Sequence, residues 1–161
     1  MKPARARRAP GRGAPLRVRC ISGPNLQLLG TREPAFYGTE TLQSIHTRLV
    51  ARGEALGAVV EVFQTNHEGD ICDLVAGCRP AGIDGLLLNA GAYTHTSLAI
   101  LDALLAVGLP CVEVHLSNPD TREAYRRRSR MAPACVGRVA GFRGESYLLA
   151  LEGLVGVLRG G

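Results

Sequence analysis

The segment GIDGLLLN, residues 82–89, decides the fold class, because it is a short and almost continuously apolar run between a glycine turn and a polar end. A run of this length is typical of a strand that is buried on both faces of a parallel sheet. Comparable runs lie at residues 16–21, 58–64, 110–116 and 134–139, and we interpret all five as strands. The patterns between and after them predict helices at residues 41–56, 69–78, 96–107, 121–127 and 144–158.

Strands that alternate with helices predict one α/β domain with a parallel sheet. We expect a doubly wound, flavodoxin-like three-layer sandwich with five strands in the order 2-1-3-4-5. In that order the chain direction reverses between strands 1 and 3, and small ligands bind beyond the carboxyl ends of the strands at that point. Polar segments follow the strands concerned: SGPN (22–25), NAG (89–91) and HLSN (115–118). The sequence therefore predicts one binding crevice at this edge of the sheet.

The basic character of the chain is concentrated at its amino end. Residues 1–17 hold six basic residues and no acid, which leaves 13 basic and 14 acidic residues in the rest of a chain whose net charge is +5. This tail is rich in Pro, Gly, Ala and Arg, so we predict that residues 1–17 are disordered and that residues 18–161 form a single catalytic domain. A transit peptide or a phosphate-binding arm is the alternative for the tail. Because the body is close to neutral, we expect no nucleic-acid partner.

Several features of the sequence exclude classes of mechanism and partner. No apolar run approaches the roughly 18 residues of a membrane span, so we expect a cytoplasmic protein without a membrane partner. Lys2 is the only lysine of the 161 residues, which leaves P-loop and Schiff-base mechanisms without a lysine in the folded body. The five cysteines are odd in number and lack zinc-ligand spacing, which indicates reduced thiols and no metal site. We also expect no organic cofactor.

The segment GPNLQLLGTREPAFYG, residues 23–38, is longer than an ordinary connection after a strand, which suggests a functional loop. It holds Arg32 and Tyr37 near Gly30 and Gly38, two glycines that would serve as the hinges of a lid. A phenol has an ordinary pKa of about 10, and a nearby guanidinium lowers that pKa. Arg32 would in this way make Tyr37 a general base. The alternative is a surface loop in which both residues are incidental.

His115 ends the fourth predicted strand, in the segment VEVHLSN (112–118). Glu113 lies two residues earlier on the same face of the sheet and would hold the imidazole in one tautomer, so we interpret His115 as catalytic rather than structural. A dense group of arginines follows. We interpret most of them as a solvated face and one as a clamp for a carboxylate: Arg122, Arg126, Arg127, Arg128 and Arg130.

The other histidines receive different interpretations. In NAGAYTHTS (89–97), His95 is predicted to start a helix that Thr94 or Thr96 caps, a position that favours anions but is equally consistent with capping alone. His46 is assigned to the surface of a helix. His67, in QTNHEGD (64–70), is assigned to a helix cap or a subunit contact.

Four motifs, in this order, resemble the type II 3-dehydroquinate dehydratases: GPNLQLLGTREPAFYG, FQTNHEGD, LNAGAYTHTSLAILDAL and VEVHLSNPDTREAYRRRS. The resemblance covers residues 18–158. It implies an anti elimination of water from 3-dehydroquinate, through an enolate, to give 3-dehydroshikimate. This reaction is the third step of the shikimate pathway, which leads to the aromatic amino acids. The resemblance implies no metal, organic cofactor or Schiff base.

The resemblance also implies the roles of individual residues. Tyr37 matches the base that removes the C2 proton, and Arg32 matches the residue that activates it. His115 matches the acid that protonates the departing C1 hydroxyl, and Asn25 matches the residue that holds a water at the enolate oxygen. Substrate binding carries over to Asn89, His95, Asp102, Leu116, Ser117 and Arg126. In the family, the residue at Asp102 reaches a neighbouring subunit's site, and the subunits assemble as a dodecamer of four trimers.

Three positions depart from the family pattern. Asn is common at the positions of Ser22 and Gln27, and His at that of Asp120; these departures concern the placement of the loop and its water. A flavodoxin-like module that binds a flavin or a nucleotide phosphate is the alternative from the fold alone. It explains the sheet but not Arg32 and Tyr37, and a chain with four Tyr and no Trp offers few partners for an isoalloxazine ring.

Overall fold

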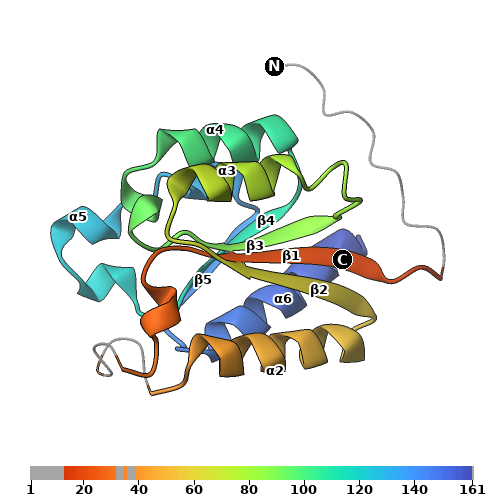
Figure 1. Cartoon of the computed structure of the whole chain (residues 1–161), viewed down its shortest axis with the longest axis horizontal. Coiled ribbons are helices and arrows are strands. Elements are labelled where there is room, and N and C mark those ends of the chain that lie inside the picture. Colours follow the sequence, from red (N-terminus) through yellow and green to blue (C-terminus); the bar gives the residue numbers. More distant parts are fainter. Residues whose placement is uncertain (1–12, 32–34, 36–38, 161) are drawn as a thin grey trace.

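The centre of the molecule is a five-stranded parallel sheet (Figure 1), in a computed structural model that describes residues 13–31, 35 and 39–160. The strands are β1 (Leu16–Ser22), β2 (Ala58–Gln64), β3 (Gly85–Asn89), β4 (Cys111–His115) and β5 (Gly137–Ala140). Their order across the sheet is β2-β1-β3-β4-β5, and all neighbouring pairs are parallel. The predicted doubly wound, flavodoxin-like sandwich is confirmed.

Helices cover both faces of the sheet. In Figure 1, α3 (Glu68–Ala76) and α4 (Leu98–Val107) lie on one face, while α2 (Leu42–Ala55) and α6 (Glu145–Leu158) lie on the other. The short α5 (Ala124–Arg127) lies to the side of these layers, at the left of Figure 1. Short 3-10 turns occur at Leu26–Leu28, Gly91–His95, Pro119–Thr121 and Ala132–Ala134.

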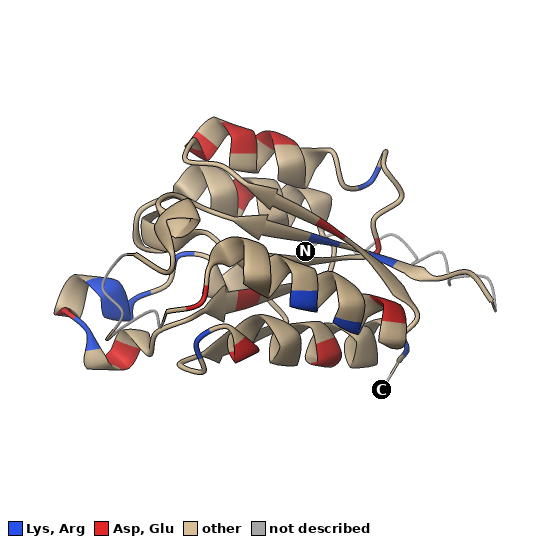
Figure 2. Ribbon diagram, turned by 60° about the horizontal axis from the view of Figure 1, so that its bottom comes forward, with Lys and Arg blue, Asp and Glu red and all other residues tan. Residues whose placement is uncertain are grey.

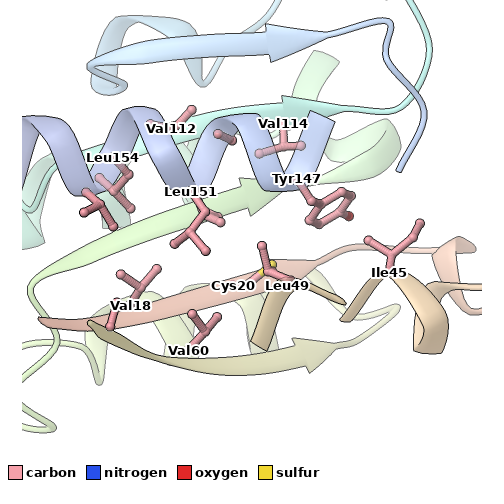
Figure 3. Packing of buried hydrophobic residues seen from close by; sticks show 14 of the residues in the cluster. Val18, Cys20, Ile45, Leu49, Val60, Val112, Val114, Tyr147, Leu151 and Leu154 are labelled. Carbon is pink, nitrogen blue, oxygen red and sulfur yellow. The ribbon is translucent and has the colours of Figure 1, made fainter. Parts of the chain in front are cut away.

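Each face of the sheet has its own apolar core, because side chains alternate along the strands. Val18 and Cys20 of β1 are fully buried in the cluster that includes residues of α2 and α6 (Figure 3). Ile21 belongs instead to the cluster under α3 and α4. Complete burial of an aliphatic side chain contributes about 1.5–3 kcal/mol to stability. The two clusters therefore hold the helices against the two faces of the sheet.

Two strands begin three residues later than predicted, while the other strand ends lie within one residue of the prediction. The third strand begins at Gly85 rather than residue 82, because Gly82 adopts a left-handed turn with φ of 70°. The fifth strand begins at Gly137 rather than residue 134. Residues 132–134 form a 3-10 turn instead, in which the backbone N–H of Ala132 donates to Oγ of Ser129 at 3.0 Å.

The helix starts differ in a way that affects the candidate site. Residues 91–95 form a 3-10 turn, and α4 begins only at Leu98, where Ser97 Oγ accepts the N–H of Ile100 at 3.0 Å. The prediction that His95 starts this helix, with Thr94 or Thr96 as its cap, is therefore wrong. The helix predicted at residues 121–127 is replaced by the turn Pro119–Thr121 and the single turn of α5.

The amino end of the described chain joins the sheet directly. Leu16 is buried in β1, and the backbone N–H of Arg17 donates to the carboxylate of Asp84 at 2.8 Å, so both residues belong to the folded body rather than to a tail. The predicted disorder of residues 1–12 lies outside the described residues. Within the described part, no helix is long and apolar enough to cross a membrane.

Candidate active site

A cavity of about 170 Å³ opens at the carboxyl ends of β1, β3 and β4, where the strand order predicts a ligand site. Its walls come from the segments after these strands and from the region of α5. The predicted site residues that line it are Asn25, Asn89, His95, His115, Leu116, Ser117 and Arg126. The fold therefore collects in one crevice residues that are up to about a hundred positions apart.

A close backbone contact places the loop after β1. The N–H of Gly23 donates to the carbonyl of Asn89 at 2.7 Å, and a Cβ atom on Gly23 would lie 2.6 Å from the carbonyl oxygen of Ala90. Only glycine fits this approach. Two residues later Asn25 adopts a left-handed conformation with φ of 66°, which Asn tolerates better than most residues, and its N–H donates to Oδ1 of Asn66 at 3.0 Å.

Asn89 ends β3 and is 3% exposed, so its amide needs partners inside the protein. Its Oδ1 accepts the N–H of Gly91 at 3.2 Å, and its Nδ2 donates to the hydroxyl of Tyr147 at 3.0 Å. The N–H of Gly91 can only donate, so this contact fixes which end of the amide carries the oxygen. Asn89 lines the cavity, and among the described residues its second N–H has no partner.

His115 and Glu113 form a buried acid–base pair at the end of β4. Nε2 of His115 lies 2.5 Å from Oε1 of Glu113, which confirms that the two side chains share a face. Burial by itself raises the pKa of Glu113, but hydrogen bonds from His115 and Ser129 and the charge of Arg138 outweigh this effect and lower it. Glu113 is therefore a carboxylate, which can only accept, and it accepts a hydrogen bond from the N–H at Nε2 of His115.

Two residues that the sequence did not single out hold Glu113 from its other sides. Ser129 Oγ donates to Oε2 of Glu113 at 2.7 Å, and Nε of Arg138 on β5 lies 3.4 Å from Oε1. Glu113 has no measurable exposure, so these contacts compensate the cost of its buried charge. With Nε2 bonded to Glu113, Nδ1 of His115 is the nitrogen that can exchange a proton with a ligand.

Basic groups surround the crevice on the α5 side. Arg122 and Arg126 line the cavity, and Nε of Arg126 lies 3.2 Å from Oε2 of Glu123. His95 is half-buried, and its Nδ1 lies 2.9 Å from the carbonyl of Arg128. Burial lowers the pKa of His95, which favours the neutral ring. Figure 2 shows bases and acids together on the α5 side, in contrast to the acidic surface of α3.

His46 is not a surface residue, contrary to the prediction. It is half-buried on α2, its Nε2 lies 3.3 Å from Oγ of Ser22, and its ring meets that of Tyr147 edge-on at 6.3 Å. Burial lowers its pKa. Because Ser22 and Tyr147 are far from His46 in the sequence, no local pattern indicated this contact. His67 does precede α3, but its side chain makes no capping hydrogen bond.

Three predicted site residues are absent from the described crevice. Arg32 and Tyr37 lie outside the described residues. Asp102 is described, but it lies exposed on α4 and does not line the cavity. All five cysteines are free, with Cys20, Cys78 and Cys111 buried. Among residues 13–31, 35 and 39–160, no group of three or more His, Cys, Asp or Glu is arranged to hold a metal ion.

The fold and the crevice together define the class of protein: a doubly wound α/β enzyme with a buried acid–base pair, and with amide and arginine side chains that line a small polar crevice. Comparison with known proteins gives the family. Residues 16–155 match the family described as Dehydroquinase class II, and the chain belongs to this family.

Relatives and solved structures agree. The chain is 50% identical over 139 residues to a 3-dehydroquinate dehydratase of Prochlorococcus marinus (strain NATL1A), covering 86% of this chain and 95% of the relative. It is 51% identical over 139 residues to the protein of that name from Parasynechococcus marenigrum (strain WH8102), covering 86% and 94%. The crystal structure of type II dehydroquinase from Butyrivibrio crossotus matches with a TM-score of 0.85 and 38% identity, over 87% of this chain and 97% of that one. These comparisons do not support the flavin- or nucleotide-binding alternative.

Proposed function

We propose that this chain is a type II 3-dehydroquinate dehydratase, a hydro-lyase that converts 3-dehydroquinate to 3-dehydroshikimate in the shikimate pathway. The observation that carries the proposal is the His115–Glu113 pair, 2.5 Å apart and facing a crevice lined by Asn89 and Arg126, in a chain of the dehydroquinase class II family. An elimination of water needs a proton donor for the departing hydroxyl, and this pair provides it.

The proposed reaction proceeds in two proton transfers. Tyr37, activated by Arg32, removes a proton from C2, and the electrons of that C–H bond form an enolate with the neighbouring ketone. The enolate then re-forms the ketone, a C1–C2 double bond appears, and the C1–O bond breaks. The imidazolium of His115 donates its proton to this oxygen, and water leaves. The carboxylate of Glu113 compensates the charge of the imidazolium.

The remaining crevice residues are proposed to bind the substrate. Arg126 and the segment at Leu116 and Ser117 suit its carboxylate, because a guanidinium and backbone N–H groups are donors matched to an anion. The free N–H of Asn89 and the ring of His95 suit its hydroxyl groups. Asn25 is proposed to hold the water at the enolate oxygen. No metal or organic cofactor takes part in this proposal.

We also propose that the subunits assemble as a dodecamer of four trimers, with Asp102 completing the site of a neighbouring subunit. Asp102 shares one exposed face of α4 with Leu98 and Leu105, which are each 58% exposed, by the i, i+4, i+7 spacing of a helix. Apolar side chains grouped in this way support a protein contact. A cytoplasmic location is proposed by analogy with a soluble biosynthetic enzyme.

The experiment that tests the reaction is an absorbance assay for the conjugated enone product, with purified full-length protein and 3-dehydroquinate. We expect product from the wild type and a rate at least about a hundredfold lower from Tyr37→Phe, the scale of general base catalysis. A wild type without product, or a fully active Tyr37→Phe, would overturn the proposal.

The proposed role of Asp102 is tested by mixing subunits. Asp102→Ala and His115→Ala are each expected to be inactive, but unfolding and refolding them together should restore activity. Mixed assemblies contain sites that take Asp102 from one subunit and His115 from the other. If the mixture stays as inactive as the separate variants, Asp102 does not act across a subunit boundary.

A further inference from the structure

A buried chain of polar side chains leads away from the crevice into the core. Tyr147, in the first turn of α6, is fully buried within the apolar cluster shown in Figure 3, and its hydroxyl lies 3.0 Å from Nδ2 of Asn89 and 3.1 Å from Oγ of Ser22. Ser22 Oγ lies 3.3 Å from Nε2 of His46. None of Tyr147, Ser22 and His46 has a role in the proposed reaction, yet together they connect α6, β1 and α2 to one crevice residue.

The direction of each hydrogen bond in this chain follows from donor and acceptor counts. Asn89 donates from Nδ2, so the phenol oxygen of Tyr147 accepts. Burial raises the pKa of Tyr147, which therefore keeps its proton and donates it to Oγ of Ser22. Ser22 in turn donates to Nε2 of His46, whose pKa is lowered by burial and which is thus a neutral acceptor. Each hydrogen bond in this chain therefore has one donor and one acceptor.

The same counts determine what Asn89 presents to the crevice. If its amide were reversed, the nitrogen would face the N–H of Gly91, and two donors would oppose each other. The Gly91 N–H therefore selects the amide orientation, and the Tyr147 hydroxyl, which accepts from Nδ2, holds the nitrogen in place. Because a neutral buried hydrogen bond contributes about 0.5–1.5 kcal/mol, losing the Tyr147 contact would leave the amide held only at its oxygen, and its nitrogen could leave the position that faces the crevice.

We infer that Tyr147 is a positioning residue, which fixes the side-chain amide of Asn89 so that it offers an N–H donor to the substrate. The inference rests on the proposed function, since Asn89 is proposed there as a substrate-binding residue. Ser22 takes part as the acceptor of the Tyr147 hydroxyl. Ser22 is one of the positions at which this chain departs from the family pattern, and it has a defined partner, Tyr147, in the core.

Tyr147→Phe tests the inference, because it removes one oxygen and keeps the ring in the core. We expect KM for 3-dehydroquinate to rise about tenfold while kcat changes less than about threefold, as for the loss of a contact that binds substrate and transition state alike. The matched control is Ser146→Ala, the next residue of α6. Ser146 is also fully buried, and its Oγ accepts only the N–H of Phe142 among the contacts described, at 3.0 Å.

The outcomes separate positioning from stability. Both variants should lose some thermal stability, but only Tyr147→Phe should change KM. If Tyr147→Phe lowers apparent kcat through loss of folded protein and leaves KM unchanged, the residue is only structural and the inference fails, although the proposed function stands. A wild type that does not dehydrate 3-dehydroquinate would overturn the proposed function and this inference with it.

A double variant tests whether Tyr147 acts through Asn89. If it does, Tyr147→Phe combined with Asn89→Ala should have the KM of Asn89→Ala alone, because the amide to be positioned is gone. Multiplicative effects on KM would overturn the inference. If Tyr147→Phe does not fold, Ser22→Ala serves instead: an unchanged KM would contradict the inference, and a rise of about threefold would support it.

Discussion

Glu113 and His115 lie two residues apart on β4, and their side chains meet at 2.5 Å between Oε1 and Nε2 while both are buried. The strand itself creates this pair, because alternate residues of a strand point to the same face. The end of β4 also lies at the crevice, so the same imidazole contacts the buried carboxylate and lines the cavity. The acid of the proposed reaction is thus oriented before any substrate arrives.

Replacing Glu113 with Gln should lower kcat by about tenfold to a hundredfold, since general acid catalysis contributes roughly 10²–10⁴ and His115 would lose its orienting charge. The measurement is kcat for enone formation, with circular dichroism to confirm the fold. Glu61→Gln is the matched control. Glu61 is an ion-paired acid on β2 that bonds Arg17 and Arg19 away from the crevice, and its replacement should not change kcat. Equal kcat values for the two variants would contradict the account.

Gly23→Ala should destabilise the protein by about 1–3 kcal/mol, as is usual when a group is forced into a packed site, because the new Cβ would lie 2.6 Å from the backbone oxygen of Ala90. Gly153→Ala, in the interior of α6 with nothing within 4 Å of its added Cβ, should stabilise it by about 0.5–1 kcal/mol. Chemical denaturation gives both free energies of unfolding. The changes in the free energy of unfolding should have opposite signs in the two variants, and changes of the same sign would contradict this prediction.

The stability of the protein should fall as the pH drops below about 6.5, the ordinary histidine pKa of an unfolded chain. Burial lowers the pKa of His46 and of His95 in the folded protein, so between their folded and unfolded values the unfolded state binds more protons. The stability that the two neutral histidines contribute is fully present above about pH 6.5, and it is lost as the pH falls toward their pKa values in the folded protein. In thermal melts, His46→Gln should show a smaller drop in Tm between about pH 7.5 and pH 5. An unchanged drop would mean that His46 is not held neutral.

Borohydride added together with 3-dehydroquinate should leave the activity intact. Trapping by borohydride requires a Schiff base to a lysine, and the only lysine is Lys2, outside the described body. The measurement is residual activity after dialysis, together with the mass of the intact chain. Inactivation with the added mass of a reduced substrate would contradict the enolate mechanism.

The sequence predicted those features that local patterns encode. Apolar runs predicted the strands, their alternation with helices predicted the doubly wound fold and hence the strand order, and alternation along β4 predicted that Glu113 faces His115. The contacts that were missed join distant residues. The hydroxyls of Ser22 and Tyr147 meet across 125 positions of sequence, and Ser129 reaches Glu113 across 16. His46 was assigned to the surface because its partners belong to β1 and α6, and no periodicity within α2 reveals them.

The sequence also predicted the first residues of the helices less well than their positions along the chain. Thr94, Thr96 and Ser97 are all good capping residues, and only the packed structure selects Ser97, whose oxygen accepts the N–H of Ile100. The remaining residues become a 3-10 turn that brings His95 to the crevice. The predicted site residue was therefore placed correctly in the crevice, but on a different element.

The central claim is that His115, held by Glu113, is the acid in the dehydration of 3-dehydroquinate. The most direct measurement is the steady-state rate of enone formation by the full-length protein and by His115→Gln, which keeps a polar side chain of similar size. We predict turnover by the wild type and a kcat at least about a hundredfold lower for the folded variant. No turnover by the wild type, or a kcat for His115→Gln within about threefold of it, would contradict the account.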